Sequence, residues 1–212
     1  MKVEAILFDF WGTLVENGVW SPIKQVKDIL GLRMPFSDYV VRMEKAMMRS
    51  EFPTLKEAFE SVCREFEVEC DEEKLEKLIG MWNKSWMLAQ PYEEVVEELQ
   101  KLRENYKLFL VSNTDSFSVN QVLDKFKLRE LFDETFLSYN LGLIKTDPGF
   151  FKRVLDKTGL NSESCIVVGD SIQSDMIAAK NAGIKAILID RKNTRDFQPK
   201  IKNLKELDIF LE

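Results

Sequence analysis

Residues 5–14 read AILFDFWGTL, a short apolar run that ends at Asp9 and is followed closely by Gly12. The run predicts a buried strand with the Asp9 carboxylate at its C-terminal end and a glycine turn after it. In an open parallel sheet, ligands bind beyond the C-terminal ends of the strands. Asp9 is therefore a candidate functional residue, although an Asp can also end a strand simply as a turn former.

Short apolar runs alternate with helical patterns through the second half of the chain. This alternation predicts an α/β fold: a three-layer, Rossmann-like core with a central parallel sheet and helices on both faces. We expect strands over residues 108–111, 134–137, 165–168 and 186–189, and helices over 93–105, 119–126, 148–158 and 174–182.

The segment between these two parts, from about residue 20 to residue 87, has a helical pattern rich in Met and aromatic residues. Thr54 and Glu57 have the spacing of a capping box that opens one of its helices. The Met and Trp side chains are expected to pack a helical bundle rather than to hold a cofactor. We predict a core domain of residues 1–15 and 91–212, with a helical bundle cap domain of residues 16–90 placed as a lid over the strand ends.

Composition excludes several classes of function. The 212 residues carry a formal net charge of -6, which opposes nucleic acid or an anionic membrane as the main partner. No apolar run is long enough to span a bilayer, and the strand predicted for residues 2–9 leaves no room for a signal peptide. The thiols Cys63, Cys70 and Cys165 show no metal-site spacing, so we expect reduced, buried cysteines and a cytoplasmic location.

Histidine is absent from the chain. This absence excludes Ser–His and Cys–His nucleophile pairs, histidine zinc sites and histidine general bases. Any catalysis must use carboxylates, hydroxyls, Lys and a hard metal ion.

Further polar residues follow the other predicted strands. Ser112 and Asn113 come after residues 108–111, Lys145 precedes a helix, and Asp170 and Asp175 come after residues 165–168. Carboxylates that lie close together repel unless a cation separates them, and oxygen ligands without His or Cys suit Mg²⁺. Each residue alone could instead be a turn former, a helix cap or a solvated loop residue.

This set resembles the haloacid dehalogenase-like hydrolase superfamily over the whole chain. Residues 9–14 correspond to the first motif, Ser112 to the second, Lys145 to the third, and Gly169-Asp170 with Asp175 to the fourth. The resemblance implies that Asp9 attacks phosphorus and forms an aspartyl-phosphate, with Lys145 as its catalytic partner. It implies phosphoryl binding by Thr13, Ser112, Asn113 and Lys145, and Mg²⁺ binding by Asp9, the Trp11 backbone carbonyl, Asp170 and Asp175.

The chain departs from the family pattern at Trp11, where phosphatases carry a second Asp that protonates the leaving group and activates water. We expect a Mg²⁺-dependent phosphatase acting on a small phosphorylated molecule. Its activity should be retained best on substrates whose leaving group needs no proton. A metal-independent 2-haloacid dehalogenase is the first alternative, with Arg33, Arg42 or Arg49 as the cation for the substrate carboxylate. A phosphate-binding regulatory module with little turnover is the second, and the oligomeric state is left open.

Overall fold

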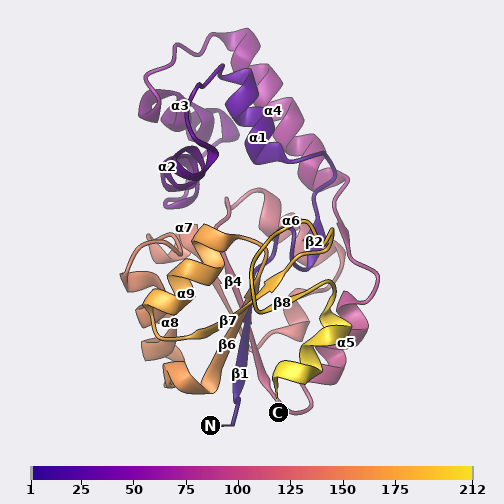
Figure 1. The fold of residues 1–212 in the computed structure, drawn as a ribbon. Helices are drawn as coiled ribbons and strands as arrows, with labels where there is room; N and C mark the ends of the chain where they lie inside the picture. The colour runs from indigo at the N-terminus through magenta and orange to yellow at the C-terminus, as the bar shows by residue number, and fades with distance from the viewer. Residues whose placement is uncertain (1, 212) are drawn as a thin grey trace.

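The computed structural model describes residues 2–211, and its centre is a sheet of six parallel strands in the order β5-β4-β1-β6-β7-β8 (Figure 1). Residues 1 and 212, the two ends of the predicted core domain, lie outside the described part of the chain. The strands are β1 Ala5–Phe8, β4 Lys107–Ser112, β5 Glu134–Leu137, β6 Cys165–Gly169, β7 Lys185–Ile189 and β8 Lys200–Ile201.

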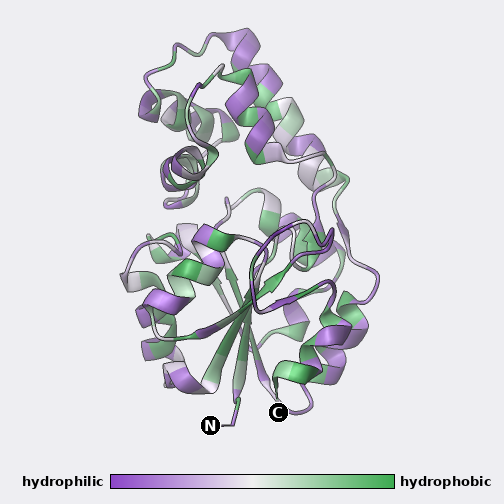
Figure 2. Ribbon diagram, viewed as in Figure 1, coloured by the Kyte–Doolittle hydropathy of each residue, from purple (hydrophilic) through white to green (hydrophobic). Residues whose placement is uncertain are grey.

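Strand β1 is buried on both faces, which explains its unbroken apolar sequence. Successive side chains of a strand point to opposite faces, so Ile6 and Phe8 join one apolar cluster while Ala5 and Leu7 join another. Hydrophobic residues accordingly concentrate along the sheet and the inner sides of the helices (Figure 2).

Helices cover both faces of the sheet, as the sequence predicts. Helices α5 and α6 and the C-terminal 3₁₀ helix η4 pack on one face, and α8 and α9 pack on the other. Their bounds are α5 Val95–Leu102, α6 Ser118–Lys125, α8 Gly149–Thr158, α9 Ala178–Asn181 and η4 Leu204–Phe210. The fold is a three-layer, Rossmann-like α/β core.

The strand order places the switch point of the sheet at β1. The chain runs from β1 outward through β4 and β5, and then returns to the other side of β1 with β6. Phe8 lies level with Leu110 of β4 and with Val168 of β6. Residues that follow these three strands therefore meet at one edge, where open α/β sheets bind their ligands.

Four helices, α1 to α4, lie beyond this edge and enclose an apolar cluster of their own (Figure 1). They are α1 Pro22–Ile29, α2 Phe36–Met48, α3 Leu55–Glu65 and α4 Glu72–Met87, and the chain enters and leaves them through the antiparallel pair β2 Val15–Glu16 and β3 Gln90–Pro91. The capping box is confirmed, because the Glu57 N–H donates to the Thr54 hydroxyl at 3.2 Å. The domain boundaries at residues 16 and 90 stay a prediction.

Some local expectations are wrong or incomplete. Cys63 and Cys70 form a disulfide in the four-helix unit instead of remaining free thiols, whereas Cys165 is free and buried as expected. The helix predicted for residues 174–182 begins as a π-helical segment, η3 Ile172–Ile177, and continues as α9. Strand β8, helix α7 Ser138–Leu141 and the 3₁₀ turns η1 Arg129–Leu131 and η2 Ser162–Ser164 are not predicted.

Within the described residues, the helices are all too short or too polar to cross a membrane.

Candidate active site

The Asp9 carboxylate lies at the centre of the site and is held from several sides. Its backbone is fixed by an N–H bond to the carbonyl of Val168 on β6. The Thr13 hydroxyl donates to Oδ2 at 3.1 Å, and the Lys145 ammonium donates to Oδ1 at 2.6 Å. Ser112 at the end of β4 approaches Oδ1 at 3.5 Å. Asp9 is therefore a buried carboxylate with a fixed orientation.

Lys145 lies in the loop between α7 and α8 and is fully enclosed between two carboxylates. Its ammonium pairs with Asp9 and with Asp175, and its backbone N–H donates to the Asn113 side-chain oxygen at 2.8 Å. Burial alone would lower the pKa of Lys145, but the adjacent Asp175 and Asp9 outweigh burial and raise it. The lysine therefore carries a permanent positive charge beside Asp9.

Three carboxylates meet at this edge of the sheet: oxygens of Asp9, Asp170 and Asp175 lie within 4.8 Å of one another. Removal from bulk water raises the pKa of Asp170, and repulsion by Asp9 and Asp175 adds to the rise. A cation placed among them would relieve this repulsion. Hard oxygen ligands without His or Cys suit Mg²⁺.

The backbone of Gly12 lies so close to Asp170 that position 12 has no space for a side chain. Gly12 has a φ of 78°, and a Cβ built there would lie 2.6 Å from Oδ2 of Asp170. The turn after β1 therefore needs glycine both for its conformation and for the close approach. On the opposite side, the Arg195 guanidinium lies 3.6 Å from Asp170.

Asp175 is held by the start of helix η3 as well as by Lys145. The Ser171 N–H donates to its Oδ2 at 2.9 Å, and Gly169 leaves the space that its carboxyl group fills. Desolvation raises the pKa of Asp175, and the nearby Lys145 charge opposes that rise. Asp175 thus fixes Lys145 and closes the buried side of the cluster.

Trp11 lines the open side of the site. Its indole N–H donates to the Thr114 hydroxyl at 3.1 Å, and its ring packs edge-on against Phe10. The side chain that stands two residues after Asp9 is therefore an apolar wall with its only donor already engaged. Metal binding by its backbone carbonyl stays a prediction.

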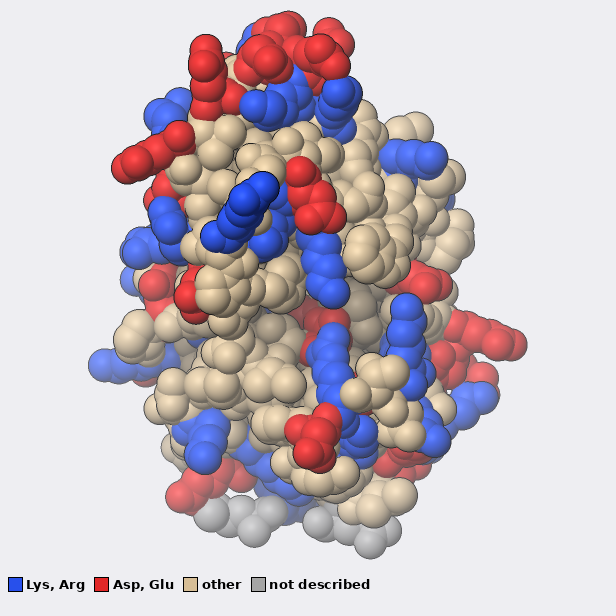
Figure 3. Space-filling model, turned by 45° about the horizontal axis from the view of Figure 1, so that its top comes forward, with Lys and Arg blue, Asp and Glu red and all other residues tan. Residues whose placement is uncertain are grey.

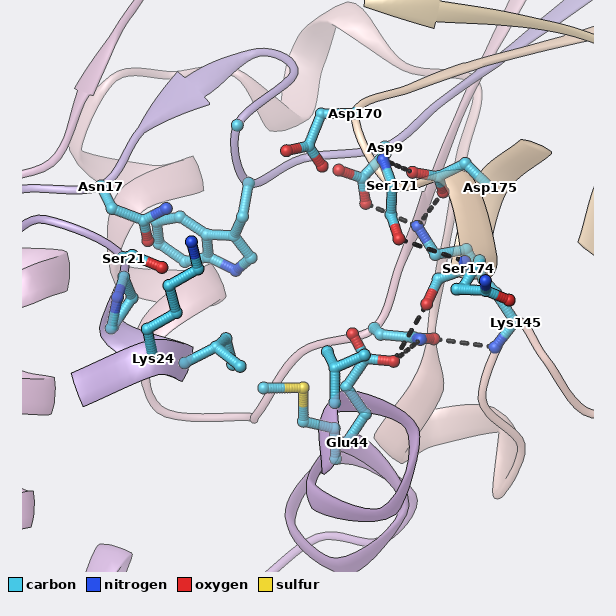
Figure 4. A pocket seen from close by; sticks show the side chains of 18 of the residues that line it. Asp9, Asn17, Ser21, Lys24, Glu44, Lys145, Asp170, Ser171, Ser174 and Asp175 are labelled. Atoms are coloured by element: carbon cyan, nitrogen blue, oxygen red, sulfur yellow. Dashed lines mark hydrogen bonds and ion pairs between the residues drawn. The ribbon is translucent and has the colours of Figure 1, made fainter. Parts of the chain in front are cut away.

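A cavity of about 510 Å³ lies over these residues, between the sheet edge and the four helices above it. Asp9, Asp170, Ser171, Ser174 and Asp175 line it from the sheet side, and Asn17, Ser21, Lys24 and Glu44 line it from the opposite side (Figure 4). On the face shown in Figure 3, acidic and basic side chains are intermixed, without the broad basic area expected of a nucleic-acid surface.

Glu44 on α2 is a site residue that sequence reasoning missed. Its Oε2 accepts hydrogen bonds from the Asn113 amide at 2.8 Å and from the Ser174 hydroxyl at 3.1 Å. Val40, Glu44 and Met48 all line the cavity and follow one another at four-residue intervals. A single acid within an otherwise apolar helical stripe is the signal that could have identified it.

Most of the residues predicted from sequence do come together. Asp9, Trp11, Asn113, Lys145, Asp170 and Asp175 line one cavity, and Ser112 lies directly behind Asp9. Thr13 directs its hydroxyl to Asp9 and does not line the cavity, and its binding of substrate stays a prediction. Arg33, Arg42 and Arg49 do not line it either; among the described residues, the cations that do are Lys24, Lys145 and Arg195.

Comparison with known proteins agrees with this geometry. A family described as haloacid dehalogenase-like hydrolase matches residues 6–189. A glyceraldehyde 3-phosphate phosphatase of Methanopyrus kandleri is 28% identical over 112 residues, which are 52% of this chain and 48% of that protein. The chain thus spans about half the length of that relative.

Longer alignments cover nearly the whole chain. A glyceraldehyde 3-phosphate phosphatase of Methanocaldococcus jannaschii is 24% identical over 205 residues, covering 92% of this chain and 89% of the relative. The crystal structure of a HAD phosphatase from Thermococcus onnurineus superimposes with a TM-score of 0.64 at 24% identity, covering 99% of this chain and 98% of that one. Because the family match extends over most of the sequence, this chain belongs to the haloacid dehalogenase-like hydrolases.

Proposed function

We propose that the protein is a Mg²⁺-dependent phosphatase that hydrolyses a small phosphorylated molecule through an aspartyl-phosphate on Asp9. The observation that supports it best is the environment of Asp9: a fixed carboxylate beside a permanently charged lysine and two further carboxylates, at the switch point of the sheet. The named activities of the phosphatase relatives point in the same direction.

Each residue has a defined part in this proposal. Asp9 attacks phosphorus, because its Oδ1 and Oδ2 are oriented by Lys145 and Thr13 rather than free to rotate. Lys145 and the Ser112-Asn113 segment bind the phosphoryl oxygens. Asp9, Asp170, the Trp11 carbonyl and Asp175 would hold Mg²⁺, which neutralises phosphoryl charge when bound.

The substrate is proposed to be a small molecule because the cavity lies beneath the four helices of the predicted cap domain, residues 16–90. A lid that closes over a site sequesters the reaction from water and limits the size of what it covers. We also propose a cytoplasmic location, which suits a small-molecule metabolite, although the Cys63–Cys70 disulfide is more typical of oxidising compartments.

The haloacid dehalogenase alternative is less well supported. The three arginines considered for the substrate carboxylate do not line the cavity, and the side chain bonded to Asn113 is the acidic Glu44. Asp170 also keeps the acidic form of the fourth motif, close to Asp9 and Asp175.

The deciding experiment measures phosphate release from p-nitrophenyl phosphate with Mg²⁺ and with EDTA, for the wild type and for Asp9→Asn. We expect release that EDTA and the substitution each abolish. Metal-independent chloride release from 2-chloropropionate would favour the dehalogenase. Binding of Mg²⁺ and phosphate without turnover of either substrate would favour the regulatory module.

A further inference from the structure

We propose that Glu44 is the acid–base residue of the reaction, supplied by the cap helix α2 in place of the carboxylate that Trp11 replaces. The inference rests on the proposed phosphatase function and names the group that would protonate the leaving oxygen and then activate water. Figure 4 shows Glu44 projecting from its helix toward Ser174 and Lys145 on the opposite wall of the cavity.

The other carboxyl groups of the cavity are already engaged. Among the described residues that line it, the acids are Asp9, Glu44, Asp115, Asp170 and Asp175. Asp9, Asp170 and Asp175 form the cluster that suits a metal ion. Glu44 and Asp115 are the remaining candidates.

Both carboxylate oxygens of Asp115 accept hydrogen bonds from neighbouring groups. Its Oδ1 accepts the backbone N–H groups of Phe117 and Ser118 at 2.9 and 2.8 Å, and its Oδ2 accepts the Trp82 indole N–H at 3.0 Å. It caps helix α6 and ties that helix to α4. Glu44 is thus the one cavity carboxyl, within residues 2–211, that serves neither purpose.

The hydrogen bonds of Glu44 are arranged asymmetrically. Asn113 and Ser174 both contact Oε2, and no hydrogen bond reaches Oε1 from the described residues. Asn113 also accepts the backbone N–H of Lys145, so its amide is oriented to donate toward Glu44. A carboxyl group anchored through one oxygen can exchange a proton through the other.

The surroundings of Glu44 adjust its proton affinity for this role. Burial raises its pKa to about 7, opposed by Lys145 and by the Asn113 and Ser174 hydrogen bonds and reinforced by Asp175. Lys145 and Asp175 are thus the charged groups of the sheet side that act on Glu44. An acid–base group works best when its pKa lies near the operating pH.

Glu44 gives up one proton in the first step and regains one in the second. Asp9 attacks phosphorus, the bond from phosphorus to the leaving oxygen breaks, and that oxygen takes the Glu44 proton and departs as an alcohol. Water then attacks the aspartyl-phosphate, its proton returns to the Glu44 carboxylate, and the bond between phosphorus and Asp9 breaks. Inorganic phosphate leaves and both side chains are restored.

The test compares Glu44→Gln with the wild type and with Asp38→Asn, which makes the same change of charge on an exposed residue of the same helix. Gln keeps an oxygen for Asn113 and Ser174, so the helix contacts are preserved. With p-nitrophenyl phosphate, the first step needs no proton because the leaving group is a weak base. The second step still needs a base.

We expect Glu44→Gln to release about one p-nitrophenolate per active site in a rapid burst, followed by steady-state turnover reduced by on the order of 10²–10⁴. Acid-quenched protein should carry phosphate, and Asp38→Asn should behave as the wild type. Turnover within about twofold of the wild type, a rise in KM alone, or slow turnover without a burst would each overturn the role of Glu44. A wild type that releases no phosphate would overturn the phosphatase proposal itself.

Discussion

At the scale of single residues, Trp11 determines which leaving groups the site can serve. Its indole N–H is bonded to Thr114 and its ring packs on Phe10, so it provides neither a proton nor a base. Any acid–base group must come from elsewhere, and a cap residue reaches the phosphoryl group only when the cap is closed. Leaving groups that need little protonation should therefore be preferred.

Replacing Trp11 by Asp should restore a carboxyl group two residues after the nucleophile. We expect Trp11→Asp to raise the turnover of glycerol 3-phosphate more than that of phenyl phosphate, because the alkoxide needs the proton more. Steady-state kcat for both substrates checks this. Equal gains, or a larger gain for the aryl ester, would contradict the role assigned to position 11, and Trp11→Phe separates the loss of the indole bond from the gain of the acid.

The residues of the site that follow strands were predictable, whereas for Glu44 the sequence pattern could mark the residue but not the groups that it contacts. Asp9, Ser112 and Asp170 lie at or just beyond the ends of β1, β4 and β6, and parallel strands bring those ends to one edge. Glu44 lies on a helix whose orientation depends on how the cap packs against the core. Local sequence does not encode that packing.

At the scale of elements, apolar runs located the longer strands well, whereas β8 escaped prediction because it has only two residues, Lys200–Ile201. The π-helical form of η3 escaped prediction because hydrophobic periodicity does not reveal a backbone bond between residues five apart, such as that from the Met176 N–H to the Ser171 carbonyl. The Cys63–Cys70 bond joins residues seven positions apart in no recognised motif. The features missed were thus a very short strand and local contacts that hydrophobic periodicity does not report.

Gly18, in the connection that leads to α1, and Gly80, in helix α4, form a matched pair for testing how tightly the chain packs at each position. A Cβ on Gly18 would lie 2.4 Å from the Leu88 side chain and 2.6 Å from the Ser85 carbonyl oxygen, whereas one on Gly80 would meet nothing within 4 Å. We expect Gly80→Ala to raise the free energy of unfolding by about 0.5–1 kcal/mol, because Gly in a helix interior is unfavourable.

Gly18→Ala should lower the free energy of unfolding, by about 1–3 kcal/mol, since the two chain connections would be pushed apart. Its KM for p-nitrophenyl phosphate should also rise, because the same connections carry the cap. Urea unfolding and steady-state kinetics of both variants measure these effects. Equal stability changes in the two variants would show that the contact at Gly18 does not constrain the cap.

At the scale of the whole molecule, helices α1 to α4 lie over the edge of the sheet, with the cavity between them. Polar contacts join the four helices to the sheet side: Glu44 with Asn113 and Ser174, the Met48 carbonyl with Ser138, Arg49 with the Gly142 carbonyl, Trp82 with Asp115 and Ser118, and the Met87 carbonyl with Lys125. The three apolar clusters are largely separate, and Trp86 of α4 packs against the cluster of the sheet. Such an interface favours closure by a small margin and permits opening for substrate exchange.

Replacing Arg49 tests how the four helices are held over the sheet edge, because its contacts are with the sheet side and not with those helices. Its guanidinium donates to the Gly142 carbonyl at 2.9 Å and lies 3.8 Å from Asp147, both in the core. Arg42, on helix α2 just before Arg49, instead pairs with Glu65 of α3 at 2.7 Å. Exposed ion pairs contribute about 0.2–1 kcal/mol.

We therefore expect Arg49→Met to shift the molecule toward the open form and to raise KM about two- to fivefold, because about 1 kcal/mol changes an equilibrium about fivefold. Arg42→Met should lower the stability of the cap and leave KM unchanged. Small-angle scattering should show a larger radius of gyration for Arg49→Met alone. If both variants raise KM equally, the contact at Gly142 does not control closure, and the cap must be held instead by Glu44 and Trp82, whose partners lie deeper in the cavity.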